Sequence, residues 1–259
     1  MNGTDVWVIP VPQVSLAELL SHSHRYLSDD ERHRLHGRRL SKGQFTFLLT
    51  RYALRDLLSF YAPDIAPADW EFSRTESGKP VVSGPVSQLS FNLSHADGMM
   101  VMAFASDGEV GIDLEHGDRA VNAEALSARY FTDAEHQQLM SLSAADRVSR
   151  FLEIWTLKEA CVKASGLGLS RALRQYEFIL QDDTGLSMIE HAPLDTAGDL
   201  SVSWQLWSCA YAGYRIALAK SALMANRESP ADPDFTVREF LWPQQIRPVQ
   251  LRVERYFSG

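Results

Sequence analysis

The feature that most constrains the fold is a set of three apolar segments separated by two Asp-Gly dipeptides. The segments read LSFNLSHA, MMVMAFAS and EVGIDLEH, and the dipeptides are Asp97-Gly98 and Asp107-Gly108. An Asp-Gly pair between apolar runs is a strong signal for a tight β-hairpin. We therefore predict a three-stranded meander, whose first and third strands run in the same direction and end at the same edge of the sheet.

The third segment carries an unusual second face. Val, Ile and Leu alternate with Gly111, Asp113 and Glu115, and side chains two apart on a strand point the same way, with Cα atoms about 6.5–7 Å apart. Two carboxylates so placed repel each other, and strands disfavour both residue types. A hard divalent cation would remove the repulsion, and Gly111 is expected to leave room for a ligand. The alternative is a pair of solvent-facing acids on an edge strand.

The meander also predicts neighbours for these acids. Ser94 and His95 come late in the first strand, as Asp113 and Glu115 come late in the third. Because both strands run the same way, we expect the four side chains near one another. Ser94 and His95 are adjacent on a strand and face opposite sides, so a hydrolase triad built on them is not expected.

The segment FLEIWTLKEACVKASG predicts a long helix with a lysine inside its apolar arc. Burying an unpaired ammonium costs several kcal/mol, so Lys158 needs an anionic partner or a long reach to water. Glu159 and Lys163 lie just beyond the arc, where a surface pair contributing roughly 0.3–0.5 kcal/mol is the alternative to a cleft. If Glu159 also reaches Asp113 and Glu115, three carboxylates share one site, and like-charge repulsion favours protonation of one unless a cation binds.

The chain repeats one plan. The helix pattern FTFLLTRYALRDLLSFY precedes the first hairpin, and the second helix precedes another hairpin, WQLWSCA and YRIALAK around Ala212-Gly213. We predict an α+β fold of two similar lobes related by a pseudo-twofold axis, each a small antiparallel sheet packed with a long helix. The expected boundaries are 1–108 for the first lobe, 109–225 for the second, and 226–259 for an extension packed along the body.

Charge and composition narrow the function classes. A net charge of −8 argues against general nucleic-acid binding, and no apolar run approaches the roughly 20 residues that span a bilayer. Residues 25–55 hold eight Arg/Lys against three acids, which indicates either an anionic partner or a solvated helix face. Two cysteines without ligand spacing, and an N-terminus unlike a signal peptide, favour a reducing cytoplasm.

Four motifs occur in a specific order: RTESGKP, FNLSH, VGIDLE and W-x-x-KEA-x-x-K, over about residues 74–168. In this order and spacing the sequence resembles the 4'-phosphopantetheinyl transferase superfamily, in particular its larger, single-chain, two-lobed type. The Arg-rich helix upstream extends the resemblance to about residue 28. The resemblance implies an active site in the cleft between the two lobes.

The resemblance also implies roles for the charged residues. Asp113, Glu115 and Glu159 correspond to ligands of Mg2+, with Mn2+ as a possible substitute. Glu159 also occupies the position that deprotonates the acceptor serine, Lys163 the one that neutralises or protonates the leaving phosphate, and Lys158 one that binds phosphate.

Coenzyme A, the implied co-substrate, is expected between the lobes. One departure is Thr46, where many relatives have an arginine, so contacts to the 3'-phosphate are expected to rely on Arg34, Arg38 or Lys42. The positions implied to hold coenzyme A are Arg34, Arg74, Gly78, Lys79, Pro80, Ser94, His95, Asp113, Lys158 and Lys163.

The predicted function is the Mg2+-dependent transfer of phosphopantetheine from coenzyme A to a serine of an acidic acyl or peptidyl carrier protein. One alternative is a binding module for coenzyme A or a carrier protein that lacks catalysis. A second is a different Mg2+-dependent phosphotransferase or hydrolase acting on nucleotides. Two lobes within one chain predict a monomer, because the cleft needs no second copy.

Overall fold

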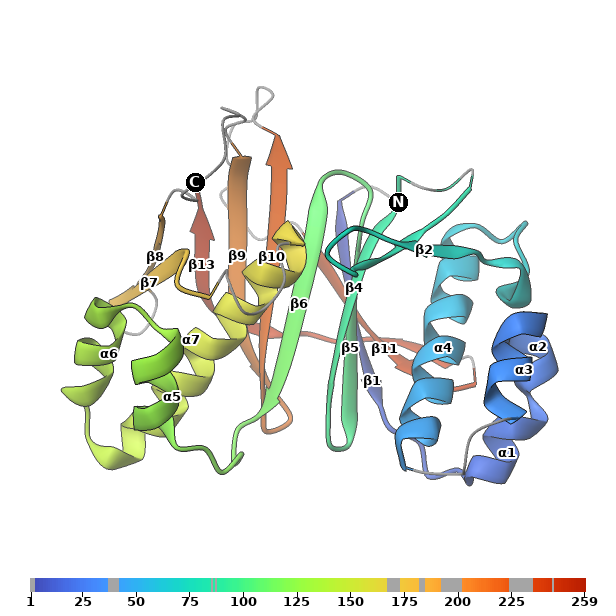
Figure 1. Ribbon diagram of the computed structural model, residues 1–259, viewed down its shortest axis with the longest axis horizontal. Helices are drawn as coiled ribbons and strands as arrows, with labels where there is room; N and C mark the ends of the chain where they lie inside the picture. The colour runs from blue at the N-terminus through green and yellow to red at the C-terminus, as the bar shows by residue number, and fades with distance from the viewer. Residues whose placement is uncertain are drawn as a thin grey trace.

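Two sheets meet in the middle of the molecule, with helices on both outer sides (Figure 1). The computed structural model describes residues 3–36, 42–84, 86, 88–166, 173–181, 185–191, 202–223, 235–243 and 245–259. The first part of the chain forms β1 (Thr4–Pro10), α1 (Leu16–Ser21), α2 (Ser23–Tyr26), α3 (Asp29–His36), α4 (Lys42–Tyr61), a 3-10 turn at Pro67–Asp69, β2 (Phe72–Arg74), β3 (Pro80–Val82), β4 (Ser90–Ala96) and β5 (Met99–Ala105).

The rest of the chain begins with the central strand β6 (Glu109–His116). It continues with α5 (Ala123–Tyr130), α6 (Asp133–Met140), α7 (Ala144–Ser165), β7 (Tyr176–Gln181), β8 (Gly185–Glu190), β9 (Val202–Tyr211), β10 (Tyr214–Leu223), β11 (Phe235–Leu241), β12 (Gln245–Pro248) and β13 (Arg252–Ser258). The predicted α+β class is confirmed. No helix in these described ranges is long and apolar enough to cross a membrane.

The five-stranded sheet has the order β12-β11-β1-β5-β4, and the four-stranded sheet the order β13-β9-β10-β6. The segment 226–259 supplies strands to both. Its strand β11 runs parallel to β1, and β13 pairs antiparallel with β9. Two small hairpins, β2-β3 and β7-β8, complete the strands of the described residues.

The predicted meander is correct for its first two strands and wrong for the third. β4 and β5 pair antiparallel around Asp97-Gly98, but β6 pairs with β10, from Tyr214 opposite His116 to Ser221 opposite Glu109. The ten-residue β10 offers β6 a full backbone register.

β4 and β6 nevertheless lie side by side, held by side chains of β4. Asn92 Oδ1 accepts from the Ile112 amide at 3.1 Å, and Ser90 Oγ accepts from the Val110 amide at 3.3 Å. The residue numbers of the two contacts increase together along β4 and β6, so the two strands run in the same direction. The predicted closeness of the two strand ends therefore holds, although the predicted ladder does not.

The two faces of β6 serve different neighbours. Val110, Ile112 and Leu114 are buried in the core between the two sheets. The opposite face packs on α7, and a Cβ at Gly111 would lie 2.0 Å from the Ala160 carbonyl oxygen and 2.4 Å from the Ala164 amide nitrogen. The expectation that Gly111 leaves room for a ligand is wrong, because the space that it leaves is filled by the backbone of α7.

Lys158 has the anionic partner that its buried position requires. Its Nζ lies 2.8 Å from Glu135 Oε2 and donates to the Leu173 carbonyl at 2.7 Å, and the side chain is fully buried. Burial lowers its pKa, while Glu135 opposes that shift. Glu135 also accepts from the Phe178 amide at 2.8 Å, so this ion pair joins α6, α7 and β7.

Substituting Glu135 by glutamine tests this buried ion pair. The amide preserves the volume and part of the hydrogen bonding but leaves the ammonium without its countercharge. We expect the free energy of unfolding to fall by about 2–3 kcal/mol in urea titrations. The exposed Glu124→Gln on α5 is the control, with an expected change of about 0.5 kcal/mol or less. Equal stability of the two variants would show that Lys158 does not depend on Glu135.

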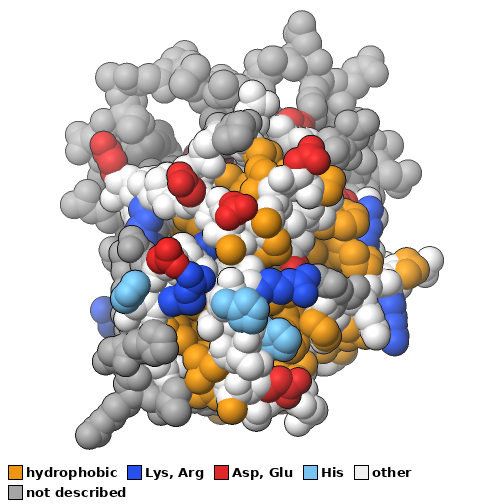
Figure 2. All heavy atoms as spheres, turned by 90° about the vertical axis from the view of Figure 1, so that its right-hand side faces the viewer, with side chains coloured by type: hydrophobic (Ala, Val, Ile, Leu, Met, Phe, Trp, Pro, Cys, Tyr) orange, Lys and Arg blue, Asp and Glu red, His pale blue; other side chains and the backbone are white. Residues whose placement is uncertain are grey.

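The basic stretch of residues 25–55 is partly neutralised within its own helices. Arg32 pairs with Asp29, and Arg55 lies 2.8 Å from Glu31 in a buried position. Arg51 lies 3.6 Å from the same glutamate. On the face formed by these helices, basic side chains lie among acidic and histidine side chains (Figure 2). The described part of this stretch is therefore a mixed surface.

Candidate active site

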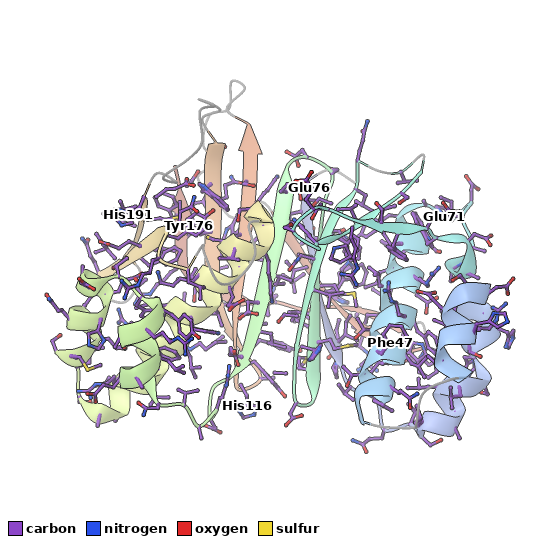
Figure 3. All side chains as sticks on the ribbon, viewed as in Figure 1. Phe47, Glu71, Glu76, His116, Tyr176 and His191 are labelled. Carbon is purple, nitrogen blue, oxygen red and sulfur yellow. The ribbon has the colours of Figure 1, made fainter. Side chains whose placement is uncertain are left out.

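A pocket of about 660 Å3 lies where β4 and β6 end, and we call it the carboxylate pocket. Ser94 and His95 line it from β4, and Asp113 and Glu115 from β6, with Arg119 in the turn that follows β6. The sequence-predicted neighbours are thus brought together. Figure 3 shows His116 at the end of β6, on the opposite side of β4 from Phe47 of α4.

Asp113 makes its hydrogen bond and its ion pair through only one of its two carboxylate oxygens. Its Oδ1 accepts from Ser94 Oγ at 2.9 Å and lies 2.6 Å from Lys163 Nζ of α7. Lys163 also donates to the Ile112 carbonyl at 3.2 Å. Asp113 Oδ2 is buried and has no hydrogen-bond partner among the described residues, so one oxygen remains available to a ligand.

Glu159 of α7 is the third carboxylate of this group. It is 7% exposed, and burial together with the negative charges of Asp113 and Glu115 raises its pKa to about 7, against an opposing contribution from Lys163. Burial likewise raises the pKa of Glu115. The three acids therefore influence one another across the β6–α7 contact, as the sequence predicts.

Two of the three carboxylates are paired with side-chain cations, so the three do not form a complete set of metal ligands. Lys163 holds Asp113, and the Arg119 guanidinium pairs with Glu115 Oε1. Within the ranges that the structure describes, no three His, Cys, Asp or Glu side chains are arranged to hold a metal ion. The acids are neighbours, but their oxygens do not point at a common position.

The donors nevertheless fit a hard divalent cation. Asp113 Oδ2 is buried without a partner, and the crowding of negative charge raises the pKa of Glu159. All available donors are carboxylate oxygens, the type that Mg2+ and Mn2+ prefer over softer metals.

The raised pKa of Glu159 predicts how stability depends on pH without divalent ions. In the unfolded chain a glutamate releases its proton near 4.5, whereas in the fold Glu159 keeps it to about 7. Between these values the folded state binds more protons, so the free energy of unfolding decreases as the pH rises. Melting curves between about pH 5 and pH 8 in chelator should show this decrease, and Glu159→Gln should make it smaller, since only the raised pKa of Glu115 then contributes. Parallel curves for both proteins would contradict the assignment.

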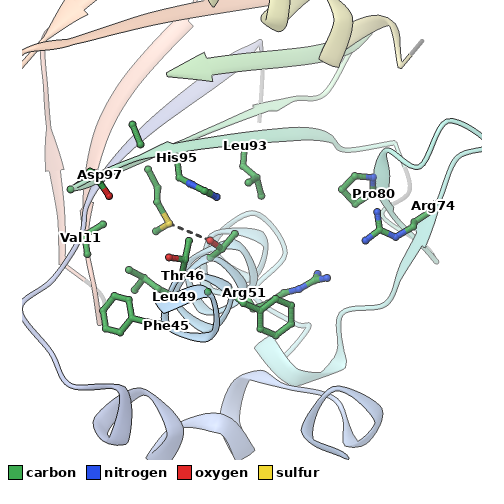
Figure 4. A pocket seen from close by; sticks show the side chains of 16 residues that line it. Val11, Phe45, Thr46, Leu49, Arg51, Arg74, Pro80, Leu93, His95 and Asp97 are labelled. Carbon is green, nitrogen blue, oxygen red and sulfur yellow. Dashed lines mark hydrogen bonds between the residues drawn. The ribbon is translucent and has the colours of Figure 1, made fainter. Parts of the chain in front are cut away.

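A second, larger pocket of about 920 Å3 lies between α4 and β4, and we call it the α4 pocket (Figure 4). Leu93 and His95 extend into it from β4, and Arg74 and Pro80 close one side. Thr46, at the position where many relatives have an arginine, lines it from α4. His95 lines the carboxylate pocket as well, so the two pockets adjoin along β4.

Arg51, one of the basic residues that the sequence suggests for polyphosphate oxygens, is a cationic side chain of the α4 pocket. Its guanidinium lies 5.5 Å from the centre of the Phe47 ring and 5.3 Å from that of Phe72. Burial lowers its pKa, while Glu31 opposes the shift. The helix period places Arg51 on the same side of α4 as Phe47.

The turn between β2 and β3 binds to the end of α7. Lys79 Nζ lies 2.7 Å from Glu109 Oε2 and donates to the Ala164 carbonyl at 3.2 Å. Gly78 has a φ of +88°, which allows the tight turn, and Arg74 donates to the Gly78 carbonyl at 2.8 Å. Lys79 thus connects the β2–β3 turn to β6 and α7. It lies beside the two pockets and lines neither of them.

One predicted residue is not brought to the site, and the side chains of three others are outside the part of the chain that is described. Lys158 is fully buried and paired with Glu135, so its predicted contact with phosphate is wrong. The side chains of Arg34 and Lys42, and all of Arg38, lie outside the described residues.

Arg119 and Tyr214 are the residues near the carboxylate pocket that sequence reasoning missed. Tyr214 packs edge-on against His116 at 4.9 Å between ring centres and donates to the Asp97 carbonyl. It thereby joins the β9–β10 turn to the β4–β5 turn. Arg119 belongs to no sequence motif, and the predicted hairpin strand that contains Tyr214 gives no sign of this contact, so only the fold reveals their place at the pocket.

Comparisons with known proteins agree on one family. The 4'-phosphopantetheinyl transferase superfamily model matches residues 109–219. The 4'-phosphopantetheinyl transferase HetI of Nostoc sp. is 31% identical over 74% of this chain and 78% of its own length. A phosphopantetheinyl transferase of Thraustochytrium sp. is 29% identical over 70% of this chain and 65% of its own.

A shorter match to a curated protein names the same activity. The 4'-phosphopantetheinyl transferase Sfp of Bacillus subtilis is 30% identical over 47% of this chain and 52% of its own length. Among solved structures, the holo-[acyl-carrier-protein] synthase of Thermotoga maritima matches 44% of this chain and 63% of its own, with 22% identity and a TM-score of 0.34.

Proposed function

The chain belongs to the 4'-phosphopantetheinyl transferase superfamily, and on this basis we propose that it transfers the 4'-phosphopantetheine arm of coenzyme A to a serine hydroxyl of an apo carrier protein. The single observation that carries the proposal is the cluster of Asp113, Glu115, Glu159 and Lys163 on facing surfaces of β6 and α7. Acids and a lysine in this arrangement suit the transfer of a phosphoryl group between two oxygens.

The reaction exchanges one phosphorus–oxygen bond for another. The serine oxygen bonds to the β-phosphorus of coenzyme A, the bond to the bridging oxygen breaks, and 3',5'-adenosine bisphosphate leaves. Glu159, with its pKa near 7, accepts the serine proton. Lys163, anchored by Asp113 and the Ile112 carbonyl, neutralises the charge that develops on the leaving phosphate.

Asp113, Glu115 and Glu159 are proposed to hold Mg2+, for which Mn2+ can substitute. The ion would supply charge neutralisation for the diphosphate. Asp113 contributes its unpartnered Oδ2, and Glu159 lies near enough for the negative charges of Asp113 and Glu115 to raise its pKa. Ser94 orients Asp113 through its hydroxyl.

Coenzyme A is proposed to lie along β4, between the carboxylate pocket and the α4 pocket. The α4 pocket has about 920 Å3, within the range of small-molecule sites. Arg74 and His95 of the predicted set, together with Arg51, supply its cationic and polar groups. Pro80 and Ser94, which line these two pockets, and Arg34, Gly78 and Lys79 are the other predicted positions that we propose to contact coenzyme A.

The finer organisation follows the same proposal. Two lobes over residues 1–108 and 109–225, related by a pseudo-twofold, would place the cleft at the β4–β6 contact, with residues 226–259 as an extension. We propose a monomer that acts in the cytoplasm. Cys161 and Cys209 are free and buried, as in proteins of a reducing compartment.

The proposal is tested by incubating the protein with coenzyme A, Mg2+ and apo acyl, peptidyl and aryl carrier proteins. We expect the mass of at least one carrier to increase by one phosphopantetheine group, and a chelator to prevent the increase. Coenzyme A binding without any mass increase would instead identify a non-catalytic binding module. Turnover of free nucleotides without an acceptor would identify another phosphotransferase or hydrolase.

A further inference from the structure

Arg119 stands at the rim of the carboxylate pocket and belongs to no sequence motif. It follows β6 in a turn closed by the hydrogen bond from its own amide to the His116 carbonyl at 3.0 Å. Its guanidinium pairs with Glu115 Oε1, while 46% of its side chain remains exposed against 15% for Glu115. The cation is therefore reachable from solvent, and the carboxylate that it holds is mostly covered.

The two cations, Lys163 and Arg119, interact with the three acids in different ways. Lys163 occupies one oxygen of Asp113 and leaves the other without a partner, whereas Arg119 takes Glu115 as its countercharge. Both cations also act on Glu159, whose pKa they lower against the larger effect of burial. Of the two, only Arg119 sits on an exposed turn with space on its pocket side.

We propose that Arg119 is a positioning residue that competes with the divalent cation for Glu115 and turns to the diphosphate when coenzyme A binds. The inference rests on the proposed function of the same site. A guanidinium forks equally well onto a carboxylate or a phosphate, and an exposed ion pair is easily exchanged. By linkage, coenzyme A then strengthens cation binding and the cation strengthens coenzyme A binding.

The competition makes two predictions of opposite sign for Arg119→Gln. Without coenzyme A, loss of the guanidinium frees Glu115 and removes a positive charge, so Mn2+ should bind about two- to fivefold more tightly, the range of a surface ion pair. With Mn2+ present, coenzyme A should bind more weakly by a similar factor. If Arg119 only stabilised the turn, the Arg119→Gln variant would bind both Mn2+ and coenzyme A more weakly.

Mn2+ binding is measured directly by electron paramagnetic resonance and coenzyme A binding by calorimetry, so neither readout requires turnover. Arg129→Gln, in which the altered residue packs over Tyr130 on α5, is the control for loss of one charge in the same lobe. Arg119→Lys keeps the charge and should stay within about twofold of the unaltered protein in Mn2+ affinity. Thermal melting checks that each variant is folded.

A double-mutant cycle isolates the pair itself. In a Glu115→Gln background, Arg119→Gln should no longer tighten Mn2+ binding, because the carboxylate for which Arg119 and the cation compete is gone. Equal Mn2+ affinity of the unaltered protein and Arg119→Gln would overturn the inference about Arg119 and leave the proposed function standing. Absence of Mn2+ binding by the unaltered protein, with or without coenzyme A, would overturn both.

Discussion

Glu159→Gln is expected to lower the turnover of carrier-protein modification by about 10²–10⁴-fold, the usual contribution of a general base. Glutamine has nearly the same size but cannot take up a proton, and it is a weaker cation ligand than a carboxylate. The position is 7% exposed and faces Asp113 and Glu115 across the β6–α7 contact. The substitution thus removes one charge without opening a cavity.

The binding of coenzyme A separates this effect from a general loss of structure. The α4 pocket lies beyond β4 and contains none of these acids, so coenzyme A affinity should change by only a few fold. Glu124→Gln on the exposed first turn of α5 serves as the control and should keep full activity. Turnover is read from the mass of the carrier protein. Near-native turnover of Glu159→Gln would refute both of its proposed roles.

Gly111→Ala is expected to be the most destabilising single methyl addition in the site, lowering the free energy of unfolding by about 3 kcal/mol or more. The added Cβ would lie 2.0 Å from the Ala160 carbonyl oxygen and 2.4 Å from the Ala164 amide nitrogen. Both atoms belong to the backbone of α7, so no side chain can rotate to relieve the clash. The helix must move away from β6.

Activity should fall together with stability, because α7 carries Lys163, whose Nζ lies 2.6 Å from Asp113 on β6. Gly84→Ala is the contrast. Gly84 has a φ of +91°, and nothing lies within 4 Å of the added Cβ, so this variant should lose only about 1–2 kcal/mol for its left-handed backbone. Urea titrations of both variants measure the difference. A loss at Gly111 no larger than at Gly84 would show that β6 and α7 approach less closely.

Local pattern predicted the parts of the fold whose signal lies within a short stretch. The Asp97-Gly98 dipeptide predicted the β4–β5 hairpin, and the alternation around Val110 and Ile112 predicted the buried face of β6. Helix periodicity placed Lys158 inside an apolar arc and predicted either an anionic partner or a long reach to water, and the anionic partner is what the structure has. These predictions succeed because turn geometry and side-chain direction depend on neighbouring residues only.

Pairings between distant segments were decided by the tertiary structure. β6 pairs with β10 over eight positions instead of completing the expected meander, and the described part of the segment 226–259 supplies strands to both sheets. The anion beside Lys158 proved to be Glu135 of α6, which removed that lysine from the phosphate site.

The same division holds for the candidate site. The motifs identified Asp113, Glu115, Glu159 and Lys163, whose grouping follows from the strand and the helix that carry them. The pairing of Arg119 with Glu115 has no counterpart in any local pattern. Sequence determined which side chains share a face, because that depends on backbone period. Only the folded chain decided which faces meet, because that depends on how all the buried surfaces and backbone groups are satisfied at once.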